Sequence, residues 1–314
     1  MRIKTNAAIA VGIVALLALP ALAQDGAWYA WSPKPDILTP YGNNKPVTRL
    51  PAVLDKHKGQ KSWSEQVILT KRYDAKWIQM APGEKTRTQY YGDDRVVWVV
   101  WGGQIRFTIE GQAPFVASKG FLVDVPQRVR YSMETVGNAP SLRFEVTHTG
   151  MNPNYPAENG EAKPANAKDG TPYIKVSTPT QPDKYDAVNH PYLDFFKDVV
   201  AADPTHGPKQ GAFVADEANF VNVIRGQGVP TPPASNLGHF HIGDDEFWFI
   251  LEGKCDYQIE GVGLLTADAG DVVLAPPGRF HRASWANGQM DTRLAFNPSP
   301  LLFHNFGEDA GGKQ

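Results

Sequence analysis

The sequence predicts an all-β protein with two similar β-domains in tandem. Short runs of β-branched and aromatic residues, each flanked by Gly, Pro, Asn or Asp, fill two regions, 76–149 and 213–296. The 314 residues include 29 glycines and 26 prolines, which favours many strands joined by turns over long helices. The same short motifs also occur in the same order in both regions.

This internal repeat is the strongest indication of two domains. Three segments of the first region correspond to three of the second: 92–94 to 243–245, 109–111 to 259–261, and 120–126 to 270–276. Chance similarity of turns is the alternative, but several matches in one order favour a duplicated β-unit.

The repeat and the composition divide the chain into four parts. We expect a signal peptide at 1–23, a first β-domain at 24–150, a linker with one helix at 151–212, and a second β-domain at 213–314. The segment 27–75 lacks a sustained period, so we expect it to wrap the first domain or pair at its edge. The linker is rich in Asn, Pro, Gly and Lys. Within it, the spacing of Leu193, Phe196, Val199 and Val200 predicts an amphipathic helix over 190–202.

The N-terminus has the pattern of a secretory signal peptide. Two basic residues, Arg2 and Lys4, precede an apolar run at 7–19, and Ala21-Leu22-Ala23 is a small-x-small cleavage site. The alternative is an uncleaved anchor, but the run is short for a span of about 20 residues. We therefore expect cleavage after Ala23 and a periplasmic or secreted protein without a membrane span.

Charge and cysteine content narrow the range of partners. The net charge is −2, from 31 Lys and Arg against 33 Asp and Glu, so nothing predicts binding to nucleic acid or to an anionic membrane. Cys255 is the only cysteine and can form no intramolecular disulfide. The expected partner is a small-molecule substrate.

Four residues of the second domain have the spacing of a metal site. Alternate residues of a strand share a face, so His239 and His241 point the same way. The turn signal 243–245 lets Glu246 return toward them, and the turn 276–280 delivers His281 from another strand. Three imidazoles and a carboxylate predict one divalent transition metal ion, such as Fe, Mn, Cu, Ni or Zn.

Residues 239–253 and 270–281 resemble the two motifs of the cupin superfamily. The first reads His-x-His, four residues, Glu, then Gly253; the second reads Gly270, five residues, Pro276-x-Gly278, two residues, His. The resemblance implies two tandem jelly-roll barrels with a metal site in the mouth of each competent barrel. Two positions depart from the motifs: Pro233 stands for the usual Gly and Trp285 for the usual Asn.

The first domain lacks this ligand set. Aligned on the repeated Gly-Asp-Asp, its ligand positions hold Thr88, Tyr90 and Arg95, and the fourth holds Tyr131. A cation in place of the carboxylate would repel a metal, so the sequence predicts a bicupin with one metal site. The first barrel is expected to be structural, with anion binding through Arg95 as the alternative.

Alternation along the strands suggests what surrounds the metal. Trp248 and Trp285 are expected to face the barrel interior, which favours an aromatic or apolar substrate, although ordinary barrel packing explains them equally well. Arg279 and Arg293 could anchor a carboxylate or phenolate. Glu246 is expected to be a ligand and the catalytic base.

Three further side chains have a simpler interpretation. Phe247 and Phe249 point outward, so we expect their burial between the two barrels or in a homodimer. His304 lies in a C-terminal segment that could cap a barrel, and we interpret it as a structural histidine.

Three functions remain open at this point. The resemblance implies a dioxygenase-type oxidoreductase, a redox-neutral decarboxylase, lyase or isomerase that uses the metal as a Lewis acid, or a non-catalytic metal- or ligand-binding cupin. The aromatic pocket favours the first. An intact ligand set beside a degraded one argues against the third.

Overall fold

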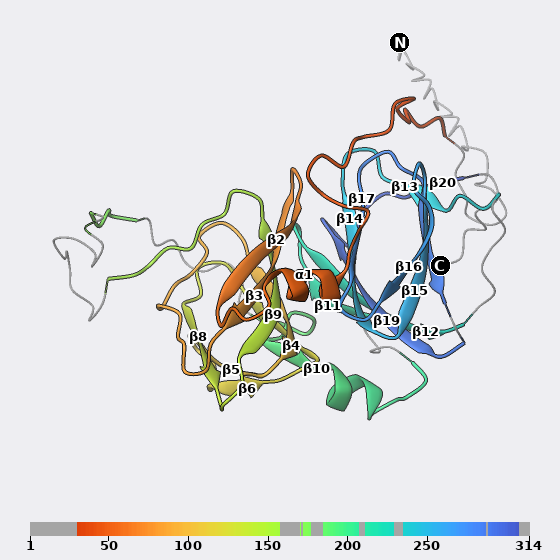
Figure 1. Cartoon of the computed structure of the whole chain (residues 1–314). Coiled ribbons are helices and arrows are strands. Elements are labelled where there is room, and N and C mark those ends of the chain that lie inside the picture. The colour runs from red at the N-terminus through yellow and green to blue at the C-terminus, as the bar shows by residue number, and fades with distance from the viewer. Residues whose placement is uncertain are drawn as a thin grey trace, which may run out of the picture.

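The structure is a computed structural model that describes residues 30–157, 170, 172–176, 185–206, 211–228, 235–286 and 288–307. Two β-barrels lie side by side, and each contains strands of one of the predicted domains (Figure 1). The expected signal peptide at 1–23 lies outside the described residues. Among the described residues, no helix combines the length and apolar character needed to cross a bilayer.

The first barrel is formed by a six-stranded sheet, β10-β7-β4-β9-β3-β2, and a three-stranded sheet, β6-β5-β8. Its strands are β2 (Trp63–Leu69), β3 (Tyr73–Met80), β4 (Val96–Gly102), β5 (Gln104–Ile109), β6 (Phe115–Ala117), β7 (Phe121–Val125), β8 (Tyr131–Val136), β9 (Ser141–His148) and β10 (Tyr192–Asp194). All ladders within the barrel are antiparallel.

The second barrel is formed by a six-stranded sheet, β1-β17-β14-β19-β12-β11, and a five-stranded sheet, β16-β15-β18-β13-β20. Its strands are β1 (Val47–Thr48), β11 (Ala212–Ala215), β12 (Phe220–Gln227), β13 (His239–Phe240), β14 (Glu246–Glu252), β15 (Lys254–Ile259), β16 (Gly263–Asp268), β17 (Val272–Ala275), β18 (His281–Trp285), β19 (Met290–Asn297) and β20 (Asn305–Phe306). The all-β prediction with two jelly-roll barrels is confirmed.

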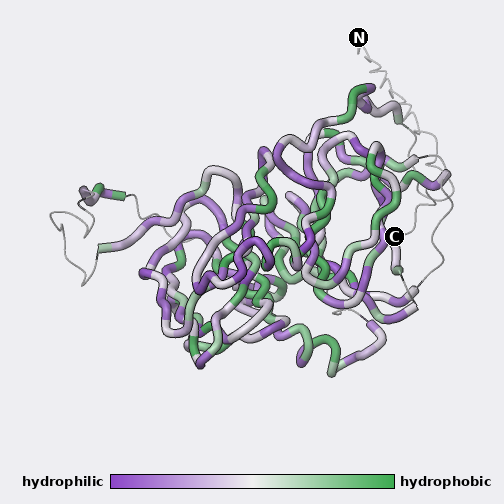
Figure 2. Tube along the Cα trace, viewed as in Figure 1, coloured by the Kyte–Doolittle hydropathy of each residue, from purple (hydrophilic) through white to green (hydrophobic). Residues whose placement is uncertain are grey.

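Side-chain alternation separates three apolar cores. In β14, Trp248 and Ile250 face the interior of the second barrel, whereas Phe247 and Phe249 face the first barrel. Strand β4 does the same, with Trp98 inside its own barrel. Because both faces of these central strands are covered, their sequences are almost continuously apolar. In Figure 2 hydrophobic segments gather where the two barrels meet.

The core between the barrels is rich in aromatic rings. The ring of Phe247 stacks on Phe296 at 4.5 Å, and Phe249 lies 5.1 Å from Phe144 and 5.7 Å from Trp77 of the first barrel. Of the two predicted ways to bury Phe247 and Phe249, the structure therefore shows the one between the two barrels.

The N-terminal segment connects the two barrels, so it does more than the expected wrapping of the first barrel or pairing at its edge. Val47 and Thr48 of β1 pair with β17 of the second barrel, where they cover a sheet edge that would otherwise expose unpaired backbone groups. The next element is the helix α1 (Leu50–Lys56). The side chain of Asp271 in the second barrel accepts a hydrogen bond of 3.0 Å from the Leu50 amide at the start of this helix. Strand β2, which follows α1 in the sequence, pairs with β3 at the edge of the first barrel, as the sequence analysis expected for part of this segment.

The segment expected to be a linker also adds a strand to the first barrel. Strand β10 pairs with β7, and a single-turn π-helix, η2 (Phe195–Val200), follows it in place of the predicted helix over 190–202. Phe195 and Val199 are the buried residues of this turn, and the amide of Phe195 donates to Gly120 at 3.1 Å. The helix is shorter than predicted because residues 192–194 satisfy their backbone groups in the sheet.

Candidate metal centre

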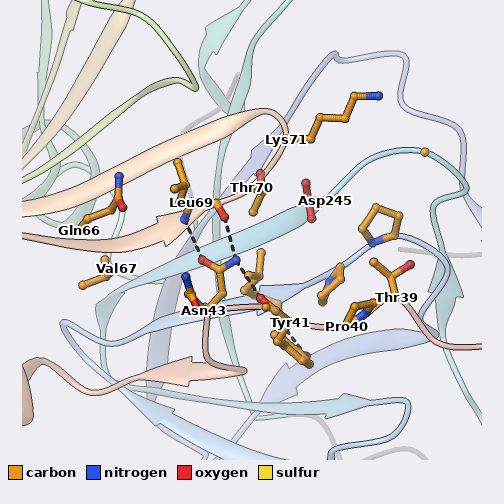
Figure 3. Close-up of a pocket in the computed structure, with 16 residues that line it drawn as sticks. Thr39, Pro40, Tyr41, Asn43, Gln66, Val67, Leu69, Thr70, Lys71 and Asp245 are labelled. Atoms are coloured by element: carbon orange, nitrogen blue, oxygen red, sulfur yellow. Dashed lines mark hydrogen bonds between the residues drawn. The ribbon is translucent and has the colours of Figure 1, made fainter.

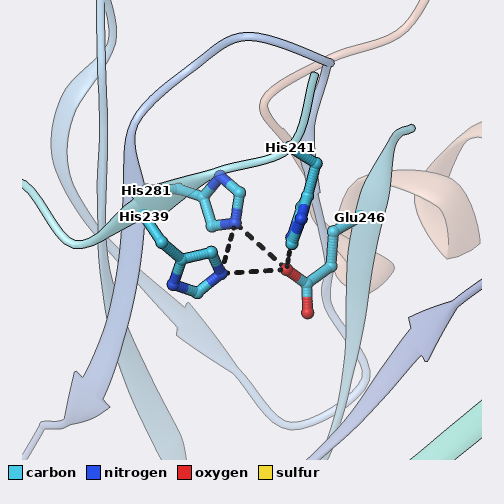
Figure 4. A group of neighbouring side chains, drawn as sticks. All are labelled: His239, His241, Glu246 and His281. Carbon is cyan, nitrogen blue, oxygen red and sulfur yellow. Dashed lines mark hydrogen bonds and ion pairs between the residues drawn. The ribbon is translucent and has the colours of Figure 1, made fainter. Parts of the chain in front are cut away.

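The four predicted metal ligands lie together in the second barrel. One donor atom from each of His239, His241, Glu246 and His281 lies within 4.8 Å of the other three, and all four residues are buried (Figure 4). Among the residues that the structure describes, no other group of three or more His, Cys, Asp or Glu side chains could hold a metal ion. The site prediction thus identified residues that the fold brings together.

Strand pairing explains why they converge. His239 of β13 is the cross-strand partner of His281, the first residue of β18. Glu246 begins β14 after the turn at 243–245, and His241 follows β13 directly. The amide of Gly278 donates to the carbonyl of His241 at 2.7 Å, which fixes the turn before β18 against the end of the His-x-His segment.

The donor atoms have the separations expected around one ion. Glu246 Oε2 lies 3.0 Å from His281 Nε2, 3.1 Å from His241 Nε2 and 3.6 Å from His239 Nε2. The Nε2 atoms of His239 and His281 are 3.1 Å apart. Ligand atoms about 2.1 Å from a common ion lie about 3.0–3.5 Å from one another, so the group fits a divalent metal.

Neighbouring carbonyls orient two of the imidazoles. His241 Nδ1 lies 3.0 Å from the carbonyl of Phe303, and His281 Nδ1 lies 2.9 Å from that of Arg279. An imidazole that donates from Nδ1 presents a lone pair at Nε2, which is the tautomer that binds a metal. Convergent lone pairs beside a carboxylate repel one another unless a cation or a proton lies between them, so the chemistry of the donor set also fits a cation.

Burial and proximity shift the pKa values of the group. Burial alone would raise the pKa of Glu246, but the neighbouring imidazoles of His239, His241 and His281 hold that pKa well below the ordinary value. Burial, together with the charges of the other two imidazoles, lowers the pKa of His239 to about 4, although the interaction with Glu246 opposes this shift. Glu246 is therefore ionised and His239 neutral at neutral pH, which are the protonation states that metal binding requires.

His304, which the sequence analysis interpreted as a structural histidine in a segment that could cap a barrel, lies beside the metal group. Its ring centroid is 4.6 Å from that of His239 and 4.8 Å from that of His241. Burial, followed by the two neighbouring imidazoles, lowers the pKa of His304 to about 4. The sequence carried no signal for this position, because a strand after residue 300 that pairs with β13 is not evident from composition or period.

Two of the four predicted pocket residues, Trp248 and Trp285, face the barrel interior. Trp248 lies 5.3 Å from the ring of His281 and 5.0 Å from Tyr257. Trp285 is the cross-strand partner of Cys255, four residues along β18 from His281. Trp248 therefore contacts the metal group, whereas the half-buried Trp285 lies at the other end of β18 from His281.

Arg293 lies beside Trp285, with its guanidinium carbon 4.5 Å from the indole ring. Arg293 is the cross-strand partner of Ile250 on the β14–β19 ladder. Along β14, Ile250 is the second inward-facing residue after Glu246, so Arg293 lies away from the metal group. Its Nε and Nη1 atoms are buried without a protein partner, as is the hydroxyl of Tyr257.

Arg279 does not line the pocket, which corrects the prediction. Its guanidinium donates to the carbonyl of Thr39 at 2.7 and 3.1 Å and to that of Glu260 at 2.7 Å, and it lies over the ring of Tyr41. Arg279, in the turn before β18, therefore anchors the N-terminal segment to the second barrel. The local sequence does not reveal this role, because Thr39 is 240 positions away from Arg279.

A separate pocket of about 480 Å³ lies between the N-terminal segment, the β2–β3 hairpin and the second barrel (Figure 3). Its walls include Tyr41, Asn43, Thr70 and Lys71. Asp245, the neighbour of Glu246, also lines it, and burial raises the pKa of that carboxyl group. None of the four metal-site residues lines this pocket.

Strand registers correct the predicted ligand positions of the first barrel. In the first barrel Gln89 is the cross-strand partner of Tyr131, and in the second barrel His239 is the partner of His281. In the same way, the pair Val96–Val125 of the first barrel corresponds to the pair Glu246–Ala275 of the second. The equivalent positions are thus Gln89, Tyr91, Val96 and Tyr131, in place of Thr88, Tyr90 and Arg95. The prediction differs because Gly92-Asp93-Asp94 lies one position earlier in its turn than Gly243-Asp244-Asp245 does, although the two turns have the same length.

Arg95 consequently faces the interface between the barrels. It binds Asp124 at very short range and Asp216 at 2.5 Å, and Asp124 is completely buried. These contacts use the guanidinium within the protein, so they do not support anion binding by Arg95. The absence of a carboxylate among Gln89, Tyr91, Val96 and Tyr131 agrees with a single metal group in the described part of the chain.

Residues 230–296 match the family model described as "Cupin domain". Among solved structures, the chain is similar to a cupin 2 conserved barrel domain protein from Leptotrichia buccalis, with a TM-score of 0.53 and 10% identity over 81% of this chain and 96% of that chain. It also matches an oxalate decarboxylase variant from Bacillus subtilis, with a TM-score of 0.48 and 11% identity over 84% and 79% of the two chains. No curated protein matches the chain. At these identities the first likeness shows the fold alone.

Proposed function

We propose that this chain, which folds as two cupin barrels, is an exported metal-dependent enzyme that acts on a small organic substrate by dioxygenase-type chemistry. The observation that carries the proposal is the buried convergence of His239, His241, Glu246 and His281. A structural role alone would not require three imidazoles and a carboxylate with their donor atoms within 4.8 Å of one another.

These residues have distinct roles in the proposed site. The three imidazoles and Glu246 would hold one divalent transition metal, which when bound would supply Lewis-acid and redox chemistry toward substrate and dioxygen. Glu246 is ionised and can also accept a proton from a substrate hydroxyl. The carbonyls of Phe303 and Arg279 fix the orientation of two imidazoles.

An apolar rim supports an aromatic or otherwise apolar substrate. Exposed apolar side chains flank the site along the chain: Leu237 at 41% and Ile242 at 47% beside the His-x-His segment, and Phe303 at 72% and Phe306 at 47% beside His304. The ring of Phe306 lies 5.6 Å from that of His239. Exposed apolar side chains gathered around a polar centre are typical of a ligand-binding entrance.

Export is part of the proposal on the basis of the sequence. The basic residues Arg2 and Lys4, the apolar run 7–19 and the site after Ala23 support a cleaved signal peptide. N-terminal sequencing of the protein from the periplasmic fraction should then begin at Gln24. A mature chain that keeps residues 1–23 would contradict this part.

The chemistry is tested by oxygen uptake. The protein purified from its own compartment is analysed for metals and then incubated with a panel of phenols in an oxygen electrode, with Glu246→Gln as the control. The proposal predicts metal-dependent oxygen consumption by the wild type alone. A redox-silent metal with no oxygen consumption would exclude the oxygenase. Carboxylic acid turnover without oxygen uptake would indicate the redox-neutral alternative, and a metal that accepts no substrate would indicate a binding protein.

A further inference from the structure

His304 is as close to the metal group as the members of that group are to one another. Its ring lies 4.6 Å from His239 and 4.8 Å from His241, whereas the three ligand imidazoles lie 4.5 to 5.3 Å apart. The group of four donor atoms nevertheless does not include His304. It therefore lies beside the metal position, next to the apolar rim.

The C-terminal strand fixes this placement. Asn305 and Phe306 of β20 pair with Phe240 and His239 of β13, and the Asn305 side-chain amide donates to the Phe240 carbonyl at 3.2 Å. The amide of Gly307 donates to the Gly238 carbonyl at 2.9 Å. His304 directly precedes β20, so the pairing of β20 with β13 holds His304 next to His239.

One ring nitrogen of His304 is available for a ligand. The imidazole is half-buried and hydrogen-bonds the backbone of Leu302. A neutral imidazole that donates from one nitrogen carries a lone pair on the other. No protein donor to that nitrogen is found among the hydrogen bonds of the described residues.

We propose that His304 is a substrate-contacting residue that accepts a hydrogen bond from a hydroxyl group of the ligand in the barrel mouth. This rests on the proposed function and deepens it, because it assigns the substrate to the hydroxyl-bearing class, such as phenols. The apolar rim contacts the body of the molecule, and His304 orients its hydroxyl group.

The test uses the full-length mature protein loaded with Co²⁺, whose visible spectrum reports ligand binding. Catechol is the probe with a hydroxyl donor, and azide is the probe without one. His304→Phe keeps a ring of similar size and removes the acceptor, while Leu301→Ala changes an 89% exposed side chain of the same segment as a control. We expect His304→Phe to retain one Co²⁺ per chain, to bind catechol about 2- to 10-fold more weakly, and to bind azide unchanged. His304→Gln, which restores an acceptor, should recover part of the catechol affinity.

The outcomes separate this inference from the proposed function. Equal catechol affinity in wild type and His304→Phe would overturn the role of His304, as would an equal loss of affinity for both probes. Loss of Co²⁺ from His304→Phe would also overturn it and would make His304 a ligand. A wild-type protein that binds no Co²⁺ would overturn the proposed function and this inference together.

Discussion

His239 and His281 lie directly opposite each other on antiparallel strands β13 and β18, and their Nε2 atoms are 3.1 Å apart. The two residues are 42 positions apart in the sequence. Because their pairing is set by the backbone ladder, the site is preformed by the barrel. Glu246 lies 3.0 Å from His281 and completes the convergence from a third strand.

Removing the charge of Glu246 should weaken metal binding. In Glu246→Gln the carboxylate donor becomes a neutral amide, and we expect Co²⁺ affinity to fall at least about tenfold, since even outer partners of metal ligands contribute this much. Titration calorimetry measures the effect. Glu110→Gln, which changes an exposed carboxylate of the first barrel, should bind Co²⁺ as the wild type does. Equal affinity in the two variants would contradict a metal role for Glu246.

Replacing Arg279 should release the N-terminal segment and leave the metal group intact. Arg279→Met leaves the carbonyls of Thr39 and Glu260 without their donor, so we expect a loss of about 1–3 kcal/mol in the free energy of unfolding. Limited proteolysis should cut near Thr39 faster than in the wild type. The exposed Arg130→Met is the control. Unchanged proteolysis together with weaker Co²⁺ binding would contradict this role and would indicate that Arg279 acts at the metal site.

The aromatic core between the barrels should couple their stabilities. Phe249 is fully buried against Trp77, Trp101 and Phe144 of the first barrel. We expect Phe249→Ala to lower the free energy of unfolding by about 3–5 kcal/mol, whereas Leu264→Ala, at a site 64% exposed, should change it by less than about 0.5 kcal/mol. Denaturant unfolding followed by tryptophan fluorescence measures both. Equal midpoints for the two variants would contradict the packing described here.

Asp124 should make stability depend on pH. Burial raises the pKa of Asp124 to about 7 and outweighs the attraction of Arg95. Because the unfolded pKa is about 3.9, the protonated carboxyl favours the folded state; this contribution is complete below about pH 4 and is lost as the pH rises through about 7.

Asp124→Asn should remove that pH dependence. The difference in unfolding free energy between wild type and variant is expected to change steadily from about pH 4 to about pH 7 and to level off above it. Urea denaturation of both proteins at several pH values measures the difference. Parallel curves across this range would show that Asp124 does not titrate as its burial implies.

The sequence predicted the parts of the fold that depend on local pattern. Alternation in β14 correctly placed Phe247 outward and Trp248 inward, because each strand residue has only two faces to occupy. The ligand spacing identified His239, His241, Glu246 and His281, which the fold brings together: a short turn separates Glu246 from the His-x-His segment, and the turn at 276–280 begins β18 at His281.

Features that depend on distant contacts were not predictable. The pairing of β1 with β17 and of β20 with β13 joins segments more than 60 residues apart, so no local signal marks Arg279 as an anchor or His304 as a neighbour of the site. The first-barrel positions were misaligned because the repeated Gly-Asp-Asp lies one residue earlier in the turn of the first barrel, and an alignment on it shifts each assigned residue to the other face of its strand. Val96, and not Arg95, therefore occupies the position of Glu246.

The central claim is that one barrel binds one metal ion through four side chains. The most direct measurement is elemental analysis of the mature protein purified from its own compartment, followed by metal titration of the stripped protein. We predict one divalent transition metal per chain, lost on replacement of Glu246 by Gln. A protein that carries no metal and gains none on titration would contradict the account.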